Sequence, residues 1–548
     1  MSILAGAALV SSSLLHSDLP PAKAPPEDPP NIVLIMADDL GYSDIGCFGG
    51  EIDTPNLDSL AEAGIRFTQF YNTARCCPTR ASLLTGRYMH QAGIGHMVYD
   101  GGSDGYRGEL GRDSVTIAEA LGANGYATAM SGKWHVTHNL GRPREMVEPD
   151  HRTNWPIDRG FDSFYGTIHG AGSFFDPISL ARGDEYIELD REDFYYTDRI
   201  NEEAVAYVMS RSSGGDHRPF FLYIAHTAPH WPLHARPDDI AANSGEYDSG
   251  WDEVRAARRE RMISMGIIDP LWPTTDRDPR VEPWDDVENK DWQARRMEVY
   301  AAQVESMDRG IGDVLQALRD TGEYENTMII FLADNGGCAE EITSRWRSLS
   351  IPEQTHDGRP VAIGNDPGVM PGAEDNYQSY GVPWANASNT PFRLYKHHVH
   401  EGGIATPLIF HWPRGISARG ETRDTPGHVI DVMATCLDVA DVVYPDRHGP
   451  HLIEPLEGTS LVPAFSDPGF RRGPLYWEHE GNRAVRIGDW KLVSRHGREW
   501  ELYDLSADRT ETMDVAAREP DRVGKMSAMY ESWAERCGVE TWPLRGGD

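Results

Sequence analysis

The sequence predicts an α/β fold, in which a large domain with a mostly parallel central sheet flanked by helices is followed by a smaller antiparallel sheet with one helix. Three observations lead to this prediction. Short apolar runs that end in polar residues alternate with segments of helical periodicity over most of the chain. Near the end of the chain this pattern gives way to short alternating segments separated by turn residues. The length of 548 residues also exceeds what one hydrophobic core usually supports, so we expect a second, smaller unit.

The fold is expected to begin at residue 31. The run NIVLIMADD at 31–39 is continuously apolar and ends in two carboxylates, as in a strand that is buried on both faces of a parallel sheet. Residues 54–67 have the periodicity of an amphipathic helix. Residues 114–135 predict a helix, a glycine-marked turn and a strand that ends in SGKWH.

The alternation continues through the rest of the chain. Three more apolar runs that end in polar or turn residues are predicted strands: 218–230, 326–337 and 404–413. Helical periodicity marks three segments: 201–213, 297–322 and 427–443. Residues 474–508 predict short antiparallel strands, and 521–537 predict the helix that accompanies them.

These elements divide the chain into a catalytic domain at 31–465 and a C-terminal α+β subdomain at 466–548, after a lead-in at 1–30. Three long stretches without clear periodicity are expected to form the rim of the site, because they exceed ordinary connectors in length: 139–195, 232–295 and 340–395.

The lead-in has a short apolar run followed by a proline-rich segment, so it is either a leader peptide or a disordered tail. No later run reaches the roughly 18 apolar residues that span a bilayer, and stable membrane insertion is therefore not expected. A soluble protein is expected, and both an exported and a cytoplasmic location remain open.

The charge of the chain excludes broad nucleic-acid binding. Asp and Glu number 86 against 51 Lys and Arg, which gives a formal net charge of −35. An anionic substrate would therefore have to be held by a local cluster of cations or a metal ion.

Polar residues that suit such a cluster follow the predicted strands. Asp38, Asp39, Asp334 and Asn335 carry the oxygen ligands that calcium or magnesium prefers, although acids after a strand also form ordinary turns and caps. Cationic or imidazole side chains follow the other strands: Lys133, His135, His226, His230 and Lys396. Together they predict a site that binds an anion with a divalent metal and several positive groups.

The adjacent Cys76 and Cys77 lie in the stretch TARCCPTRASLLTGRY. The six cysteines of the chain have no metal-binding or redox spacing, and neighbouring cysteines would form a strained ring, so a disulfide between them is not expected. Cys76 has Arg75 and Arg80 nearby and precedes a predicted helix, which suits a reactive thiolate. A buried, inert thiol is the other interpretation of the same residues.

The stretch CCPTR followed by ASLLTGRY resembles the signature C-x-P-[S/T]-R of the type I sulfatases, which belong to the alkaline phosphatase superfamily. Other segments extend the resemblance over about 31–505, and it is greatest to bacterial arylsulfatases. The segments are IVLIMADDLGYSDIGCFGG, SGKWH, FLYIAHTAPHWPL, FLADNGG and PFRLYKHHVHEGGIATPLI. The resemblance implies an alkaline-phosphatase-like fold and hydrolysis of sulfate monoesters.

It also implies a role for each site residue. Cys76 would be converted to Cα-formylglycine by a formylglycine-generating or anaerobic sulfatase-maturating enzyme, while Cys77 fills a variable position. A single calcium ion would be held by Asp38, Asp39, residue 76, Asp334 and Asn335. Arg80 would anchor the formylglycine hydrate. Four residues would surround the sulfate oxygens and the leaving group: Lys133, His135, His230 and Lys396. No organic cofactor is expected.

Two other functions are consistent with the fold. A phosphonate monoester hydrolase or phosphodiesterase can share the fold and the formylglycine, and a non-catalytic binder of sulfated glycans could keep the fold without turnover. The expected substrate is a sulfated small molecule or saccharide. The candidates for contacts to its alcohol part are His169, Trp231, His397 and His398.

Overall fold

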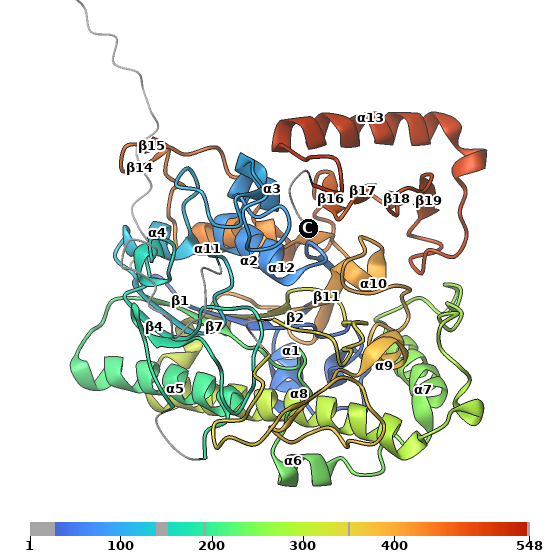
Figure 1. Ribbon diagram of the computed structural model, residues 1–548. Helices are drawn as coiled ribbons and strands as arrows, with labels where there is room; N and C mark the ends of the chain where they lie inside the picture. The colour runs from blue at the N-terminus through green and yellow to red at the C-terminus, as the bar shows by residue number, and fades with distance from the viewer. Residues whose placement is uncertain (1–27, 139–151, 190–192, 349–350, 545–548) are drawn as a thin grey trace, which may run out of the picture.

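The computed structural model describes residues 28–138, 152–189, 193–348 and 351–544. A large sheet crosses the molecule with helices on both faces, and a small sheet lies beside it under the last helix (Figure 1). The strand order of the large sheet is β12-β2-β11-β8-β1-β7-β3-β4-β5-β6, and β13 also pairs with β2. The fold class is therefore as predicted.

The strands of the large sheet have the following bounds: β1 Asn31–Ala37, β2 Ile65–Tyr71, β3 Ala127–Gly132, β4 Ser163–Thr167, β5 Leu180–Arg182, β6 Glu185–Tyr186, β7 Phe220–Ala225, β8 Thr327–Ala333, β11 Ala405–His411, β12 Glu421–Arg423 and β13 Gly427–His428. The main helices are α1 Pro55–Glu62, α2 Cys76–Thr85, α3 Met89–Ala92, α4 Ile117–Gly122, α5 Tyr196–Gly214, α6 Pro237–Ala242, α7 Gly250–Ser264, α8 Lys290–Asp320, α9 Gly381–Ser388, α10 Glu401–Ile404, α11 Ile430–Val439, α12 Val462–Ser466 and α13 Pro520–Cys537.

The centre of the sheet is parallel. Strand β1 pairs in parallel with β7 and β8, and β3 pairs in parallel with β7 and β4. Strand β11 runs antiparallel between β2 and β8, so the sheet is mixed at that point. All residues of β1, β7 and β8 are buried, which explains their continuous apolar sequences.

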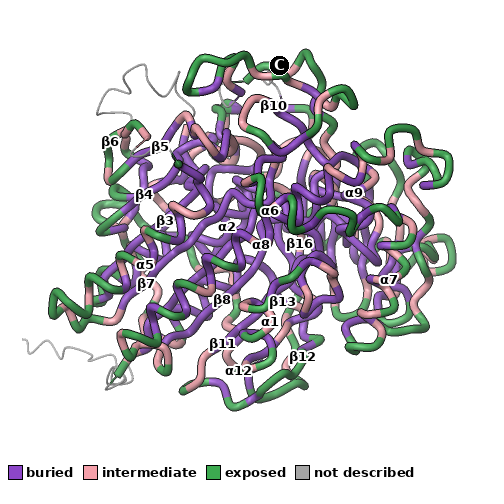
Figure 2. The backbone as a smooth tube through the Cα atoms, turned by 90° about the horizontal axis from the view of Figure 1, so that it is seen from below, coloured by how far each residue is buried: buried purple, intermediate pink, exposed green. Residues whose placement is uncertain are grey.

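Two cores lie on opposite faces of the sheet because successive strand residues point to opposite sides. Val33 and Ile35 belong to the core that contains the apolar side of α8. Ile32, Leu34 and Met36 belong to the core that contains α2, α4 and α11. Figure 2 shows the buried residues along the central strands and the exposed ones at the periphery.

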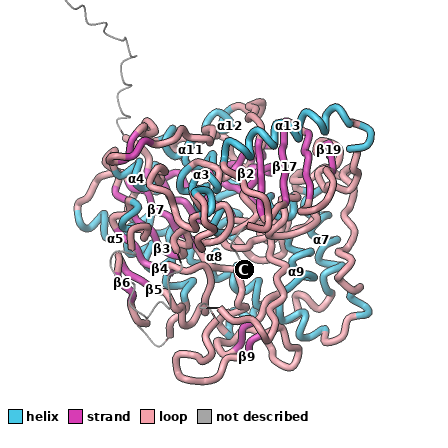
Figure 3. The backbone as a smooth tube through the Cα atoms, turned by 45° about the horizontal axis from the view of Figure 1, so that its top comes forward, coloured by secondary structure: helices cyan, strands magenta, loops and turns pink. Residues whose placement is uncertain are grey.

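The C-terminal sheet is a four-stranded antiparallel meander: β16 Leu475–His479, β17 Asn482–Ile487, β18 Trp490–Ser494 and β19 Glu501–Asp504. Helix α13 lies along this sheet (Figure 3). Met526, Tyr530 and Trp533 of the helix belong to one apolar cluster with Val485, Leu492 and Leu502 of the sheet. This sheet is joined to the large one by a buried ion network, in which Glu401 accepts hydrogen bonds from Lys491 at 2.8 Å and Arg509 at 2.9 Å.

Two expectations about local structure were wrong. The segment 54–67 is not one helix, because α1 ends at Glu62 and Ile65 begins β2, whose residues pair with β11 and β12. The stretch 232–295 is not irregular, because it contains α6, α7 and the start of α8.

Helix α7 packs on α9, and its Arg258 is fully buried against Asp44 at 2.6 Å. The other two long stretches are not wholly irregular either in their described parts. The first contains the sheet strands β4, β5 and β6, and the second contains β9 Ala362–Ile363, β10 Asn376–Tyr377 and helix α9.

The predictions for residues 1–27 and 139–151 lie outside the described residues. Within the described ranges, none of the helices has both the length and the apolar sequence that a membrane span requires.

Candidate active site

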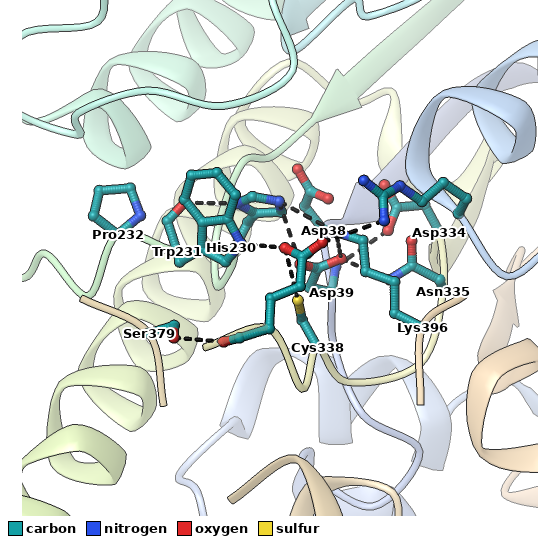
Figure 4. A network of polar contacts seen from close by, with 12 residues as sticks. Asp38, Asp39, His230, Trp231, Pro232, Asp334, Asn335, Cys338, Ser379 and Lys396 are labelled. Carbon is teal, nitrogen blue, oxygen red and sulfur yellow. Dashed lines mark hydrogen bonds and ion pairs between the residues drawn. The ribbon is translucent and has the colours of Figure 1, made fainter. Parts of the chain in front are cut away.

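The carboxyl ends of β1 and β8 bring four predicted metal ligands together. Ala37 and Ala333 are paired in the parallel register, so Asp38 and Asp39 lie beside Asp334 and Asn335. The backbone N–H of Asp39 donates to Asp334 Oδ1 at 3.1 Å, and Asn335 Nδ2 donates to Asp39 Oδ1 at 2.6 Å. Figure 4 shows these side chains converging with His230 and Lys396.

The predicted cations lie around this acidic centre. Lys133 follows β3 and donates to Asp38 Oδ2 at 2.5 Å. Lys396 donates to Asp39 Oδ2 at 2.9 Å. The predicted strand that ends in SGKWH is too long: β3 ends at Gly132, so Lys133 and His135 lie in the loop that follows, where His135 has a positive φ of 56°.

Cys76 is the first residue of α2, and Arg80 lies one turn further along the helix. Arg80 is fully buried and donates through Nη2 and Nε to Asp334 Oδ2, at 2.9 and 3.2 Å, and through Nη1 to the carbonyl of Lys133 at 3.0 Å. Arg80 thus connects the cysteine-bearing helix to the acids at the strand ends.

Cys76 and His135 lie beside each other, with the Cys76 thiol and an imidazole nitrogen within 4.8 Å. A hydrogen bond from the neighbouring Cys77, together with the charge of Lys133, lowers the pKa of Cys76 well below its usual value. Both cysteines are free thiols, as the sequence predicts. Cys77 faces the apolar core that α2 shares with α11, where its thiol lies 3.4 Å from the carbonyl of His96.

His230 has a defined tautomer. Its Nδ1 lies 2.6 Å from the carbonyl of Trp231, which can only accept, so Nδ1 carries the proton. Its Nε2 therefore faces Lys396 Nζ at 3.3 Å with a lone pair. Burial lowers the pKa of His230 to about 4 and that of His135 to about 3, so both rings are neutral near pH 7.

The oxygens at the strand ends fit a hard cation. Asp38 Oδ1 and Asn335 Oδ1 are buried and have no hydrogen-bond partner among the described residues. Burial and the neighbouring Asp38 charge raise the pKa of Asp334 well above its usual value, which indicates that the acids are crowded. Carboxylate and amide oxygens are the ligands that Ca²⁺ binds in proteins, so the residues present fit that ion.

A second set of polar residues, each partly exposed, lies next to the site, and we call this region the mouth. Glu340 accepts hydrogen bonds from Trp231 Nε1 at 2.7 Å and from Arg75 Nη1 at 3.2 Å, and His397 Nε2 lies 3.0 Å from its carboxylate. Sequence reasoning missed Glu340 and gave Arg75 no rim role. The available signal for Glu340 was its place in DNGGCAE, the loop that begins at two predicted metal ligands.

Of the candidates for alcohol contacts, Trp231 and His397 lie at this mouth, whereas His398 does not. His398 lines a different pocket, between Asp278 and Tyr503. His169 is buried one residue before Gly170, where an added Cβ would lie 2.1 Å from Cε1 of His135.

Comparisons with known proteins show which family the chain belongs to. Residues 30–442 match the family model described as Sulfatase, and 392–528 match the C-terminal model of N-sulphoglucosamine sulphohydrolase. The chain is 32% identical to an uncharacterised sulfatase of Schizosaccharomyces pombe over 94% of this chain and 95% of that one. It is 33% identical to an arylsulfatase of Klebsiella aerogenes over 80% and 93% of the two chains.

A solved structure is similar over nearly the whole length. The structure of Ps i-CgsB in complex with k-i-k-neocarrahexaose aligns with a TM-score of 0.65 and 25% identity, covering 95% of this chain and 96% of that one.

Proposed function

The chain belongs to the sulfatase family and is a sulfuric ester hydrolase, and from this premise we propose that it cleaves sulfate monoesters with a formylglycine formed from Cys76 and a single calcium ion. The observation that carries the proposal is the buried cluster in which the first residue of α2 meets oxygen ligands from two strand ends and lysines from two other segments. This arrangement suits a sulfuryl group, whose oxygens are anionic and whose sulfur must be reached by a nucleophile.

Calcium would be held by Asp38, Asp39, Asp334, Asn335 and the oxygen of the modified residue 76. The free Oδ1 atoms of Asp38 and Asn335 support this assignment, since each lacks another partner among the described residues. When bound, the ion would supply positive charge that offsets the charge growing on the sulfuryl oxygens. Lys133 and Lys396 would then be released from carboxylates that they contact here, and both could donate to sulfate oxygens.

The maturation of Cys76 is supported by its sequence context CCPTR and would require a formylglycine-generating or anaerobic maturating enzyme. The hydrated aldehyde supplies two hydroxyls on one carbon, so one can attack sulfur and the other can later expel sulfate as the aldehyde re-forms. Arg80 is placed to orient this residue, because it lies one turn along α2 and is itself held by Asp334.

Proton transfers are assigned to the residues around the sulfur position. Asp334 accepts the proton of the attacking hydroxyl, and His135 accepts the proton of the second hydroxyl during sulfate release. Burial lowers the pKa of His135 to about 3, so its ring is neutral before it takes this proton. The His230–Lys396 pair, joined at 3.3 Å, supplies the proton to the departing alcohol.

The alcohol part of the substrate would leave through the mouth formed by Trp231, Glu340 and His397. The aromatic ring and the polar side chains there suit a sulfated small molecule or a saccharide. The similarity to an arylsulfatase supports the first class, and the oligosaccharide bound by Ps i-CgsB supports the second.

Two measurements test the proposal. Mass spectrometry of the peptide that contains residue 76 should find the aldehyde, which has lost sulfur and is lighter than the cysteine form. Calcium-loaded protein should release sulfate from an aryl sulfate faster than it cleaves the matching aryl phosphonate or phosphodiester.

A clear preference for the phosphonate or the diester would instead assign the competing hydrolase activity. An unmodified Cys76 in natively produced protein, with no turnover of any sulfate ester, would favour a non-catalytic glycan binder.

A further inference from the structure

We propose that His96, His397, His479 and Glu480 form a second metal site, one that takes zinc or a similar transition-metal ion. These four residues are called the histidine cluster below. They come from the loop after α3, the loop after Lys396, and the end of β16 with its turn. None of them is a ligand in the calcium site proposed above, so the two sites can be tested separately.

The carboxylate of Glu480 is surrounded by three imidazoles. Its Oε1 lies 3.4 Å from His96 Nε2 and 3.6 Å from His479 Nε2, and its Oε2 lies 2.9 Å from His397 Nδ1. The rings of His96 and His397 lie with their centroids 5.3 and 6.1 Å from that of His479. One ligand atom each of His397, His479 and Glu480 lies within 4.8 Å of the others.

His479 gives the most direct indication of a bound ion. Its side chain is fully buried, yet neither ring nitrogen has a hydrogen-bond partner among the residues that the structure describes. Burying an imidazole without a partner is costly, and a metal ion is a chemical species that would satisfy its lone pair.

The spacing matches a tetrahedral ion. Zinc binds imidazole nitrogen and carboxylate oxygen at about 2.0–2.1 Å, which places neighbouring ligand atoms about 3.3 Å apart. The separations of 3.4 and 3.6 Å from Glu480 to His96 and His479 are close to this value. His397, His479 and Glu480 have ligand atoms within 4.8 Å of one another, and His96, which lies 3.4 Å from Glu480, would move toward the ion as the fourth ligand. Imidazole and carboxylate ligands of this kind suit zinc or copper better than calcium.

Two other charged side chains lie beside the histidine cluster, and they pair with each other. Arg75 contacts both ring nitrogens of His397, but its guanidinium is paired with Glu340 at 3.2 Å. A bound ion would take one nitrogen of His397 and leave the other to Glu340. It would also tie the turn after β16 to the loop of Lys396, where Asn482 Nδ2 already donates to the carbonyl of His397 at 3.1 Å.

The test is zinc binding to calcium-saturated protein, measured by equilibrium dialysis and metal analysis. Wild type should retain one zinc per chain. His479→Gln and Glu480→Gln should bind it about tenfold or more weakly, because each removes a ligand. His451→Gln, a change at an exposed histidine of β15 (His451–Leu452), is the matched control and should bind as wild type does.

Two further measurements cover the remaining outcomes. Asp38→Asn should retain zinc, since it alters only the calcium site, and zinc should raise the melting temperature of wild type but not of Glu480→Gln. Substitution with Co²⁺ should give the visible spectrum of a tetrahedral, nitrogen-ligated ion. Equal zinc binding by wild type and both cluster variants, or loss of zinc only in Asp38→Asn, would overturn the proposal.

Discussion

At the scale of single residues, the two adjacent cysteines have different surroundings. Both thiols lie within 4.8 Å of an imidazole nitrogen of His135, but Cys77 also belongs to the apolar core that α2 shares with α11. Burial raises the pKa of the Cys77 thiol well above its usual value, whereas a hydrogen bond from Cys77 and the charge of Lys133 lower the pKa of Cys76.

Replacement of Cys76 by Ala should therefore abolish turnover while the protein stays folded. Cys77→Ala should keep nearly all activity and cost about 1 kcal/mol of stability, because it removes only a small buried group. Sulfate release and urea unfolding measure the two effects. If Cys77→Ala lost as much activity as Cys76→Ala, the assignment of the nucleophile would be wrong.

At the scale of elements, β3 and β7 approach each other very closely at their ends, just before Lys133. Gly132 has a φ of 114°, and a Cβ there would lie 2.0 Å from the carbonyl oxygen of Ala225 on β7. Only glycine allows this approach of the two strand ends. This close approach of the strand ends brings the polar residues that follow β3 and β7 to one site.

Gly132→Ala should destabilise the protein by about 3 kcal/mol or more and lower activity with it, because a backbone carbonyl cannot move aside as a side chain can. Gly125→Ala is the control: it also has a positive φ, 90°, but its Cβ would meet no atom within 4 Å. We expect it to cost only about 1 kcal/mol, from backbone strain. The urea concentrations at half-unfolding compare the stability of the two variants. Equal losses of stability would contradict the steric argument.

The junction between the two sheets is a second element-scale feature, because Glu401 is fully buried between Lys491 and Arg509. Burial alone would raise the pKa of Glu401, but the charges of Lys491 and Arg509 lower it from 4.5 to about 2. A carboxyl whose pKa is lower in the folded state stabilises the fold above its unfolded value of 4.5, and that contribution is lost as the pH falls toward 2.

The wild type should thus lose roughly 3 kcal/mol through this group between about pH 5 and pH 2. Glu401→Gln should be less stable at pH 7 and should lack this part of the acid dependence. Urea unfolding of both proteins at several pH values gives the difference. A parallel acid dependence in the two proteins would show that the carboxylate does not stabilise the junction.

At the scale of the whole molecule, the net charge of −35 must be carried by the surface, while the site gathers its cations inside. Self-repulsion of the surface charges destabilises the compact state, and salt screens it over a Debye length of about 10 Å at 0.1 M.

Raising NaCl from about 0.01 M to about 0.5 M should therefore raise the melting temperature of the calcium-loaded protein. A scanning calorimetry series measures this shift, and KCl at equal ionic strength should give the same result. An unchanged or lower melting temperature would show that local ion pairs outweigh the global repulsion.

The sequence by itself determined much of this protein. Continuous apolar runs predicted the buried parallel strands, because a strand covered on both faces has no polar side. The motif around Cys76 and the polar residues at strand ends predicted the acids and cations that the structure brings together. Local periodicity did not separate α1 from β2, and it missed α7 within a polar stretch.

Only the tertiary structure decided which distant residues meet. The parallel register of Ala37 and Ala333 brings Asp39 to Asp334, although they are far apart in the chain. The rim residue Glu340 and the histidine cluster are likewise products of packing between loops and the C-terminal turn. Spacing along the chain reports local geometry, whereas these sites depend on sheet order, which is set by the burial of whole strands and helices.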